Sequence, residues 1–528
     1  MRESTTTANR QIARAAGTVM VAFFFSQVTG LVRRILVANA FGAGFELDAF
    51  IAANRVSETV FNLVAGGALG SAFIPTFTTL LSKDDNRSAW RLASSVANLV
   101  FLVISLLAGL AVIFAPQIVR YALAPGFSAD PSQEALTISL LRIQIGSAVL
   151  FGLSGLVMGI LNAHQVFLIP ALTPSMYQFG LIFGVIILVP KMGIYGLAWG
   201  VIVGATLHLL LQVPALIRRK GSYTITLGLK DPPVGEVIYL MVPRLLGVAV
   251  VQLNFWVNTL LASLMARGSV TGIEYGFALM LIAQIAIAQS IATAAMPTLA
   301  AQFAIGKLDE MRASLVASLR GVLLLSIPAA LGLIMLRYPL VVMLYQRGEF
   351  TKRSTELVAW ALLWYAVGLV GHSVVEILAR AFYALHDTKT PVIVGTVAMA
   401  LNVVFSFIFS GLFAHIGWMP HGGLALANSL ATALEMVGLL FLMRKRLNGL
   451  DGTNILRGVG QASLATLGMG FALALWLQGY LSLTAWQVTL GGAAIGAIVY
   501  CLGVWILKVP EFIVLSRTIN KMIERLVS

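Results

Sequence analysis

Charged side chains interrupt two apolar stretches near the start of the chain, within residues 26–77, and a glycine-containing turn at 41–44 joins the stretches. The charged residues are Arg33 and Arg34 in the first stretch and Asp48, Arg55 and Glu58 in the second. A charge at the centre of a membrane span costs about 2.5 kcal/mol or more, and such a residue usually faces a cavity or a partner. These five residues are therefore the candidate functional residues.

The spacing of these residues predicts a binding site for an anion. If the first span ends near residue 41 and the second begins near Asp48, Arg33 and Arg55 both lie about 10–12 Å inside, at 1.5 Å per residue. Glu58 is three residues beyond Arg55, so the two side chains share a helix face and can pair. Arginine binds phosphate through two parallel hydrogen bonds, and a water-poor cavity strengthens that contact. We expect a phosphate or pyrophosphate group to bind Arg33, Arg34 and Arg55.

An alternative interpretation gives these residues a structural role. Arg33 and Arg34 would then pair with Asp48 and Glu58 and hold the two helices together, or extend to the membrane surface. Gln27 and Glu274 are secondary candidates for the site. Glu274 lies near the expected outer end of its span, at a position that roughly corresponds to Asp48 in an internal repeat.

Other polar residues inside apolar stretches predict helix contacts. Glu376 and Arg380 are four residues apart and should form an ion pair within one helix. Three asparagines could bind a sodium ion or bridge helices; they are Asn254, Asn258 and Asn402. The sequence contains no nucleotide-binding loop, catalytic triad or cluster of metal ligands, so we expect no enzymatic activity, no metal and no cofactor.

The composition predicts an all-α polytopic membrane protein. The chain has 528 residues, of which 59% are hydrophobic and 11% charged, with a mean hydropathy of +0.91; a soluble domain averages about 25% charged residues. Apolar runs of about 20 residues recur along the chain. Fourteen spans are expected, at 16–41, 47–74, 91–115, 135–161, 166–189, 193–217, 236–264, 271–299, 313–336, 355–384, 391–414, 421–443, 459–479 and 485–507.

The distribution of basic residues predicts the orientation in the membrane. A net charge of +14 would suggest nucleic acid as the partner of a soluble protein. Here most Lys and Arg residues lie in alternate loops, which favours the cytoplasmic side for those loops and for both termini. Nucleic acid is therefore not expected as a partner, whereas membrane lipids are. The tail 509–528 has the spacing of an amphipathic helix on the inner leaflet.

Two short motifs recur at one offset, which indicates an internal repeat. GSAFIPTFTTL (70–80) is similar to TAAMPTLAAQF (293–303), and LNAHQVFLIPALTP (161–174) is similar to YALHDTKTPVIVGT (383–396). Six expected spans separate the copies, so both copies have the same orientation. We expect two six-helix lobes related by a pseudo-two-fold axis along the membrane normal, over 1–220 and 221–450, with spans 13 and 14 and the tail at 451–528.

Several motifs resemble those of the MurJ/MviN family of lipid II flippases, which belongs to the MOP superfamily together with the MATE exporters. They are SQVTGLVRRILVANAFGAGFELDAF (26–50), APGF (124–127), VMLYQRGEF (342–350) and ARAFYALHDTKTPV (379–392), and they follow the family's order. The resemblance implies a cationic cavity between two lobes that alternate between inward-open and outward-open states. It also implies a groove beside spans 13 and 14 for a polyprenyl tail.

The resemblance is partial at the charged positions of that cavity. Arg33, Asp48 and Arg55 match family charges, whereas Arg34 replaces an acidic residue and Gln27 replaces an arginine. Family charges are also replaced at three other positions, Phe61, Gly66 and Ala278. Arg34 could compensate for part of the missing positive charge.

The resemblance implies a flippase in the bacterial cytoplasmic (inner) membrane. Its cargo would be lipid II, the undecaprenyl-pyrophosphate-linked peptidoglycan precursor, moved from the inner to the outer leaflet for cell-wall synthesis. One alternative is an exporter of another lipid-linked glycan or an amphiphile, which the missing cavity charges favour. The other is a non-transporting scaffold that recruits cell-wall synthesis proteins.

Overall fold

The computed structural model describes residues 22, 24–63, 70–479 and 483–511, and within these ranges the regular elements are all helices. Eleven described helices are long and apolar enough to cross a membrane, and a twelfth is added if the bent pair Pro232–Val242 and Gly247–Ser263 is one span. The all-α prediction is confirmed, and the protein is a multi-pass membrane protein.

The last twelve predicted spans each overlap one of these described helices. The first two predicted spans include residues 16–21, 23 and 64–69, which lie outside the described residues. The total of fourteen spans therefore stays a prediction. The predicted amphipathic helix over 509–528 also lies outside the described residues from 512 onward.

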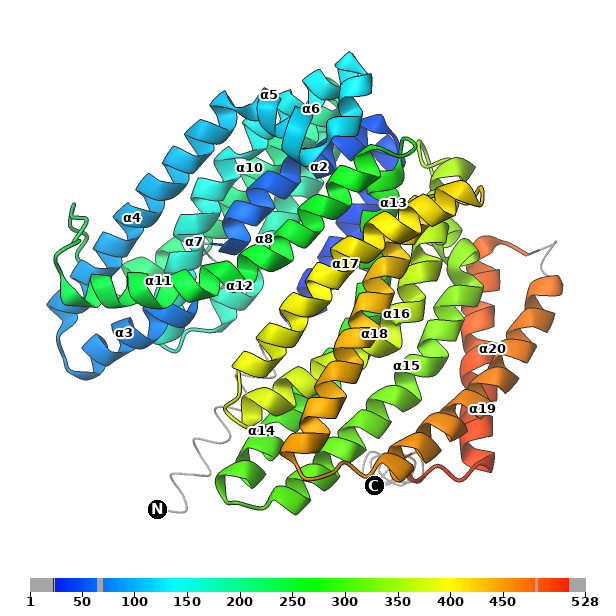
Figure 1. Ribbon diagram of the computed structural model, residues 1–528. Coiled ribbons are helices and arrows are strands. Elements are labelled where there is room, and N and C mark those ends of the chain that lie inside the picture. The colour runs from blue at the N-terminus through cyan, green and yellow to red at the C-terminus, as the bar shows by residue number, and fades with distance from the viewer. Residues whose placement is uncertain (1–21, 23, 64–69, 480–482, 512–528) are drawn as a thin grey trace, which may run out of the picture. The chain divides into compact units, whose positions relative to one another are not determined.

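The first compact unit comprises Met1–Val270 together with Arg347–Phe350. It begins with a helix over 24–41. The helices that follow, coloured blue to green in Figure 1, are α2 (Phe45–Phe61), α3 (Gly70–Ser82), α4 (Asn86–Ile113), α5 (Ala115–Gln117), η2 (Ile118–Leu123), η3 (Pro125–Ala129), α6 (Pro131–Gln144), α7 (Gly146–Ala163), α8 (Leu168–Phe183), η4 (Gly184–Leu188), α9 (Val189–Met192), α10 (Ile194–Leu210), α11 (Val213–Ile217) and α12 (Pro232–Ser263).

The second compact unit comprises Thr271–Gln346 and Thr351–Ser528. Its helices are α13 (Ser269–Gln284), η5 (Ile285–Gln289), α14 (Ser290–Ala304), α15 (Leu308–Tyr345), α16 (Lys352–Ala384), α17 (Lys389–His415), α18 (His421–Arg446), α19 (Gly452–Gln478) and α20 (Ala485–Ile506). The units divide near residue 270, and α12 packs on α2, α3 and α4 of the first unit. The predicted lobe bounds at 220 and 450 stay a prediction.

Short acidic or hydroxyl side chains set where several helices begin. The Asp85 carboxylate accepts a hydrogen bond from the Ser88 N–H at 3.0 Å, which satisfies a donor that the first turn of α4 leaves unpaired. Asp130 does the same for α6 and Asp451 for α19. Hydrogen bonds lower the pKa of each carboxyl group below its usual range, because they stabilise the ionised form. The largest contribution comes from the Ser88 N–H at Asp85, the Ser132 hydroxyl at Asp130 and the Thr453 hydroxyl at Asp451.

Glycines bring α8 and α10 of the first unit into backbone contact. Gly180 and Gly184 are four residues apart and face Gly200 and Gly204, which have the same spacing. A Cβ atom added at Gly180 would lie 2.1 Å from the Cα atom of Gly204. In a membrane, where helices gain little from burying apolar surface, such small residues let helices approach closely enough to pack.

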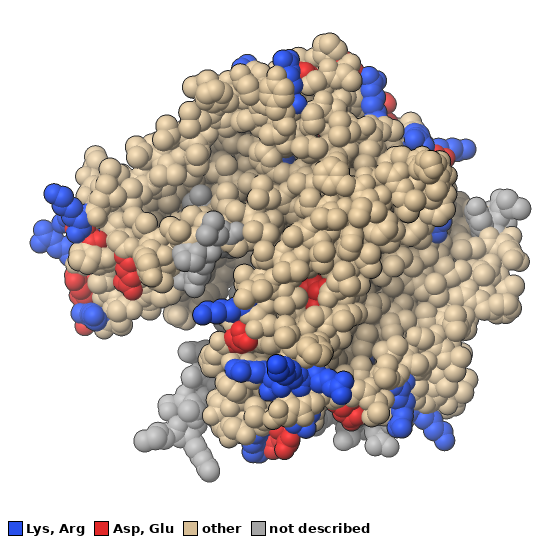
Figure 2. Space-filling view, in the orientation of Figure 1, with Lys and Arg blue, Asp and Glu red and all other residues tan. Residues whose placement is uncertain are grey.

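The core of the second unit lies among α14, α15, α16 and α18. Leu319, Leu378, Phe382 and Met443 are each 0–1% exposed there. A separate cluster joins α19 and α20 to α15, where the Tyr500 hydroxyl donates a 2.5 Å hydrogen bond to the Leu324 carbonyl. Charged residues in Figure 2 gather near helix ends, and the sides of α17 and α18 are mostly uncharged, as expected for surfaces that face lipid.

The repeated motifs have matching local structures. Pro75 and Pro297 each lie inside a helix, α3 and α14. The two later motifs end α7 and α16 with the same three backbone hydrogen bonds around a residue of positive φ, Gln165 in one and His386 in the other. These shared features support the internal repeat that the sequence predicts.

Candidate functional site

The first helix, 24–41, lies along α8 within the first unit. The rings of Phe25 and Phe179 are 6.1 Å apart, and a Cβ atom added at Gly30 would lie 3.5 Å from the Gln178 side chain. Arg33 is three residues beyond Gly30 and so shares the helix face that meets α8. Arg33 and Arg34 are both half-buried.

Arg55 and Glu58 form the ion pair that their spacing predicts. The Arg55 Nη1 atom lies 3.1 Å from Glu58 Oε2, and the Asn54 amide donates to Glu58 Oε1 at 2.7 Å. The Arg55 side chain is 11% exposed and that of Glu58 is 45% exposed. The carboxylate is therefore held at both oxygens, and the guanidinium is the more buried partner.

Helix α12 supports Arg55 from another side. The Arg55 guanidinium lies over the Phe255 ring, 5.1 Å from its centroid. The Trp256 indole donates to the Thr59 hydroxyl at 2.7 Å, and that hydroxyl donates to the Arg55 carbonyl, also at 2.7 Å. An aromatic ring engages the plane of a guanidinium, whereas carboxylates and phosphates bind the N–H groups along its edge.

Tyr177 of α8 connects Arg33 with the polar face of α2. Its side chain lies within hydrogen-bonding reach of Asn54 and within electrostatic reach of both Arg33 and Glu58. Residues from the first helix, α2 and α8 therefore meet at one place in the first unit. The common depth of Arg33 and Arg55 stays a prediction.

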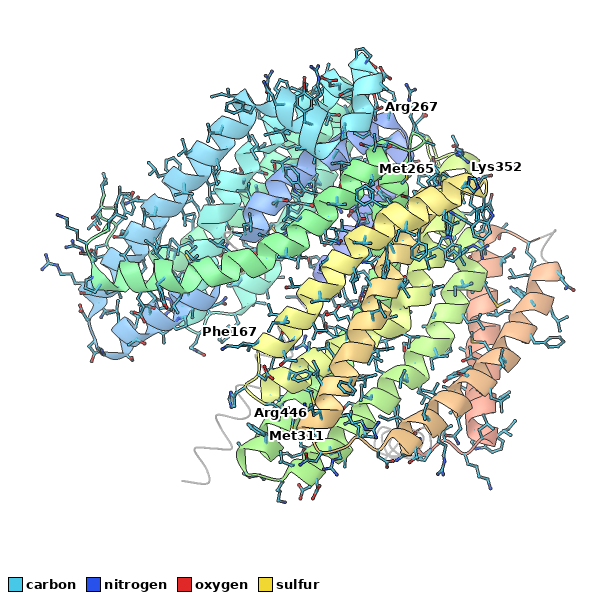
Figure 3. The ribbon with its side chains drawn as sticks, viewed as in Figure 1. Phe167, Met265, Arg267, Met311, Lys352 and Arg446 are labelled. Carbon is cyan, nitrogen blue, oxygen red and sulfur yellow. The ribbon has the colours of Figure 1, made fainter. Side chains whose placement is uncertain are left out.

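Asp48 lies at a different level and contacts another part of the unit. It is 1% exposed, and its Oδ2 atom accepts a 2.6 Å hydrogen bond from the Gly268 N–H, in the loop after α12. In the same loop Arg267, labelled in Figure 3, pairs with Asp130 at 2.6 Å. Asp48 lies seven residues before Arg55, about 10 Å along the helix. Its described contact fixes the start of α2.

The two secondary candidates differ in exposure. Gln27 is an exposed residue of the first helix. Glu274 is half-buried on α13, in the second unit.

The other polar residues inside the helices make local contacts. The predicted Glu376–Arg380 ion pair is confirmed at 2.8 Å. The Asn258 amide donates to Asn254 Oδ1 at 3.2 Å within α12, and Asn402 Oδ1 accepts from Ser406 within α17. Among the described residues, no group of three or more His, Cys, Asp and Glu side chains has the arrangement of a metal site.

Comparison with known proteins decides the family. The family model described as "Lipid II flippase MurJ" matches residues 37–490. The chain belongs to the MurJ family. The lipid II flippase MurJ of Burkholderia cenocepacia is 31% identical over 441 residues, covering 82% of this chain and 84% of the relative. The probable lipid II flippase MurJ of Vibrio cholerae is 29% identical over 438 residues, covering 81% and 82%.

Solved structures give the same family and fold. A lipid II flippase MurJ in an inward closed conformation matches with a TM-score of 0.80 at 26% identity, covering 93% of this chain and 98% of the other. A multidrug resistance MATE family transporter of the MOP superfamily, in an inward-facing conformation, matches with a TM-score of 0.69, covering 81% and 96%; at 17% identity it shows a shared fold alone. The resemblance to the MurJ family that the sequence motifs indicate is confirmed.

The structure gives a local reason for two departures from the charges that the MurJ resemblance implies. Phe61 packs against Phe151, with ring centroids 4.8 Å apart, so an aromatic contact occupies that position of α2. Ala278 is 2% exposed within the second unit.

Three neighbours of Arg33 and Arg55 were missed from the sequence. Asn54 had a usable signal, because it lies four residues before Glu58 on the same helix face. Tyr177 and Phe255 had none, because each comes from a distant helix and is an ordinary residue of an apolar segment.

Proposed function

We propose that this protein moves lipid II from the inner to the outer leaflet of the bacterial cytoplasmic membrane by alternating access, for peptidoglycan synthesis. The observation that carries the proposal is the Arg55 guanidinium, which is only 11% exposed and is held by Glu58 and Phe255 within a membrane-spanning protein. Membership of the MurJ family supports the same cargo. Transport of this kind makes and breaks no covalent bond, so we expect no catalytic residue.

The pyrophosphate of the cargo binds Arg33, Arg34 and Arg55 in this proposal. These three residues are all cations, and guanidinium groups bind phosphate oxygens in pairs. Asp48 contributes by fixing the start of α2. Gln27 and Glu274 remain secondary candidates for contact with the rest of the headgroup.

Two lobes that rock about this site would open it to each side in turn. We assign the lobes to 1–220 and 221–450, within fourteen spans and with 451–528 as an addition beside the lobes. The repeated helix ends at Gln165 and His386 support a pseudo-two-fold relation. The basic loops support cytoplasmic positions for both termini. A pyrophosphate that binds one state better than the other shifts the population toward that state.

A second candidate function is the export of another lipid-linked glycan or an amphiphile. Phe61 favours it, because an aromatic contact occupies a position where the family resemblance implies a charge. Gln27 favours it for the same reason on the first helix. A non-transporting scaffold for cell-wall synthesis proteins has no comparable support, because a scaffold does not require buried arginines.

The test is transport by the purified chain in vesicles. Lipid II with a labelled headgroup is placed in both leaflets, and a membrane-impermeant reagent reports how fast the inner pool becomes accessible. Faster access for lipid II supports the proposal, and faster access only for other lipid-linked sugars supports the second candidate. No acceleration for either contradicts both transport functions.

Alanine variants connect transport to the site. Arg33→Ala and Arg34→Ala should each slow the movement of lipid II and fail to restore growth of cells that lack their own flippase. Full activity in both variants would exclude the anion site at the first helix.

A further inference from the structure

A polar loop between α11 and α12 lies along the side of α4, within the first unit. We call residues 221–230 the arm. The arm begins at Gly221, which contacts Trp90 of α4, and extends along the helix to Asn98. It then returns, and Gly228 contacts Ser95 of α4. Asn98 is eight residues beyond Trp90, about 12 Å along the helix. Figure 1 shows the arm rising beside α4.

Side chains of α4 hold the arm in place. The Asn98 amide donates to the carbonyls of Thr224 at 3.3 Å and Thr226 at 2.8 Å, and its Oδ1 accepts from the Tyr223 hydroxyl at 2.5 Å. The Ser94 hydroxyl accepts from the Thr224 N–H at 3.1 Å. The arm therefore has one defined path, although it pairs with no strand.

Two glycines keep the arm close against the helix. A Cβ atom added at Gly221 would lie 2.3 Å from the Trp90 ring. Gly228 has a φ of +56°, and a Cβ atom there would lie 2.4 Å from the Ser95 hydroxyl. A larger residue at either position would push the arm away from α4.

Large side chains at alternate positions of the arm are exposed. Tyr223 is 66% exposed, Ile225 91%, Leu227 39% and Leu229 64%. The Tyr223 hydroxyl is held by Asn98 of α4, whereas Ile225, Leu227 and Leu229 are exposed apolar side chains with no polar atom to bond to α4. The most exposed of them, Ile225, is at the tip of the arm.

Basic residues lie at the base of the arm. Arg218, Arg219, Lys220 and Lys230 are all exposed. The space-filling view shows Lys and Arg side chains at this end of the unit, with Asp and Glu side chains among them (Figure 2). The sequence predicts the cytoplasmic side for this loop because of these cations.

The neighbouring helix places the tip of the arm at the level of the membrane surface. α4 is a candidate membrane span, and its exposed apolar run begins shortly beyond Asn98, with Phe101 at 53% and Leu102 at 55%. An apolar tip with a basic base is the pattern of segments that lie in the interface of anionic membranes. A partner in solution would not require the apolar tip to lie beside the start of a lipid-facing surface.

We propose that the arm is a membrane-interface anchor, in which the apolar side chains enter the boundary between headgroups and acyl chains. The four cations at its base bind the phosphates of anionic phospholipids. The anchor fixes the position of α4 and of the start of α12 relative to the lipid surface. It is independent of the cargo that the protein moves.

A depth measurement on the full chain tests the anchor. Cys501 is the chain's single cysteine; in a Cys501→Ser background, Ile225→Cys carries a fluorescent label at the tip and Ser222→Cys carries the same label at the base as the matched control. Each variant is reconstituted in phosphatidylglycerol–phosphatidylcholine vesicles and in phosphatidylcholine vesicles. Quenching by nitroxide-labelled lipid is compared with quenching by aqueous iodide.

In the mixed vesicles, we expect lipid nitroxide to quench the label at 225 several-fold more than the label at 222, and iodide to show the reverse. The difference should shrink in phosphatidylcholine alone and after R218Q, R219Q, K220Q and K230Q together. Equal access of iodide to both labels would overturn the proposal and leave the arm open to a soluble partner. Insertion of the tip without dependence on anionic lipid would overturn the role of the four cations. If Ile225→Cys does not fold, Leu229→Cys serves as the second probe, with a smaller expected difference.

Discussion

Replacing Arg55 with leucine separates a functional role from a structural one, because its ion pair with Glu58 and its contact with Phe255 together contribute little to stability. Its ion pair with Glu58 involves a carboxylate side chain that is 45% exposed, so it contributes only about 0.3–0.5 kcal/mol. The contact with the Phe255 ring adds about 1 kcal/mol. Arg55→Leu should therefore lower the free energy of unfolding by about 1–2 kcal/mol, after allowing for the apolar contact that leucine keeps.

The expected loss of function is much larger. Two charge-assisted hydrogen bonds to a phosphate contribute about 1.5–3 kcal/mol each. Their loss lowers the affinity for the pyrophosphate by a factor of about 10² to 10⁴, at 1.4 kcal/mol for each factor of ten. Transport of lipid II by Arg55→Leu should fall accordingly when the cargo is dilute. Arg55→Lys should be intermediate, because it keeps the charge and loses the paired geometry.

The assay is the rate at which labelled lipid II becomes accessible in vesicles, measured beside the unfolding transition of the same variant in detergent. Arg353→Leu is the matched control, since Arg353 also pairs with a glutamate three residues on, at 3.5 Å, and both partners are exposed. Normal transport by a folded Arg55→Leu protein would refute the anion site. A loss of transport matched by a large loss of stability would instead assign Arg55 a structural role.

Three further predictions follow from contacts outside the arginine cluster. Asp48→Ala should destabilise the protein by about 1.5–3 kcal/mol and Asp48→Asn by less, because an amide oxygen can still accept from Gly268; equal losses in unfolding assays would contradict this. Glu511→Ala removes a carboxylate partner of Arg320, whose side chain is 6% exposed. It should lower the free energy of unfolding by about as much as Asp48→Ala does, and an unchanged unfolding transition would argue against the ion pair. Hydrogen bonds from the Thr390 N–H and hydroxyl lower the pKa of Asp387 below its usual range. Its stabilising effect is therefore present above the pKa of an unfolded aspartate and is lost as the pH falls through the lowered pKa. The stability advantage over Asp387→Asn should therefore fade on acidification, and a constant difference in a pH series would disprove it.

Contacts within one helix could be predicted from the sequence. The pairs Arg55–Glu58 and Glu376–Arg380 follow from a helix repeat of 3.6 residues, which places such neighbours on one face whatever surrounds the helix. The family could also be predicted, because its motifs lie in local stretches of sequence. The positions of most spans followed from the need to match apolar length to the thickness of a bilayer.

Contacts between helices could not be predicted. Asp48 was a candidate for binding cargo, and its described hydrogen bond goes to the Gly268 backbone, a group that every residue carries and that therefore has no sequence signal. The position of the arm depends on Asn98, an ordinary polar residue near the start of a span. Asn98 meets the arm only because the chain returns to α4 after passing through all the elements from α5 to α11.

The sequence by itself determined that this chain crosses a membrane as helices, that it belongs to the MurJ family, and that it carries arginines within its membrane-spanning segments. Each of these conclusions rests on hydrophobicity and spacing, which act locally along the chain. Only the tertiary structure decided that Phe255 and Tyr177 are neighbours of the arginines, that Asp48 holds a loop, and that Ile225, Leu227 and Leu229 of the arm are exposed beside α4. Those contacts depend on which side chains of distant helices fit together, and a close approach such as that of Gly180 to Gly204 is decided by packing in three dimensions.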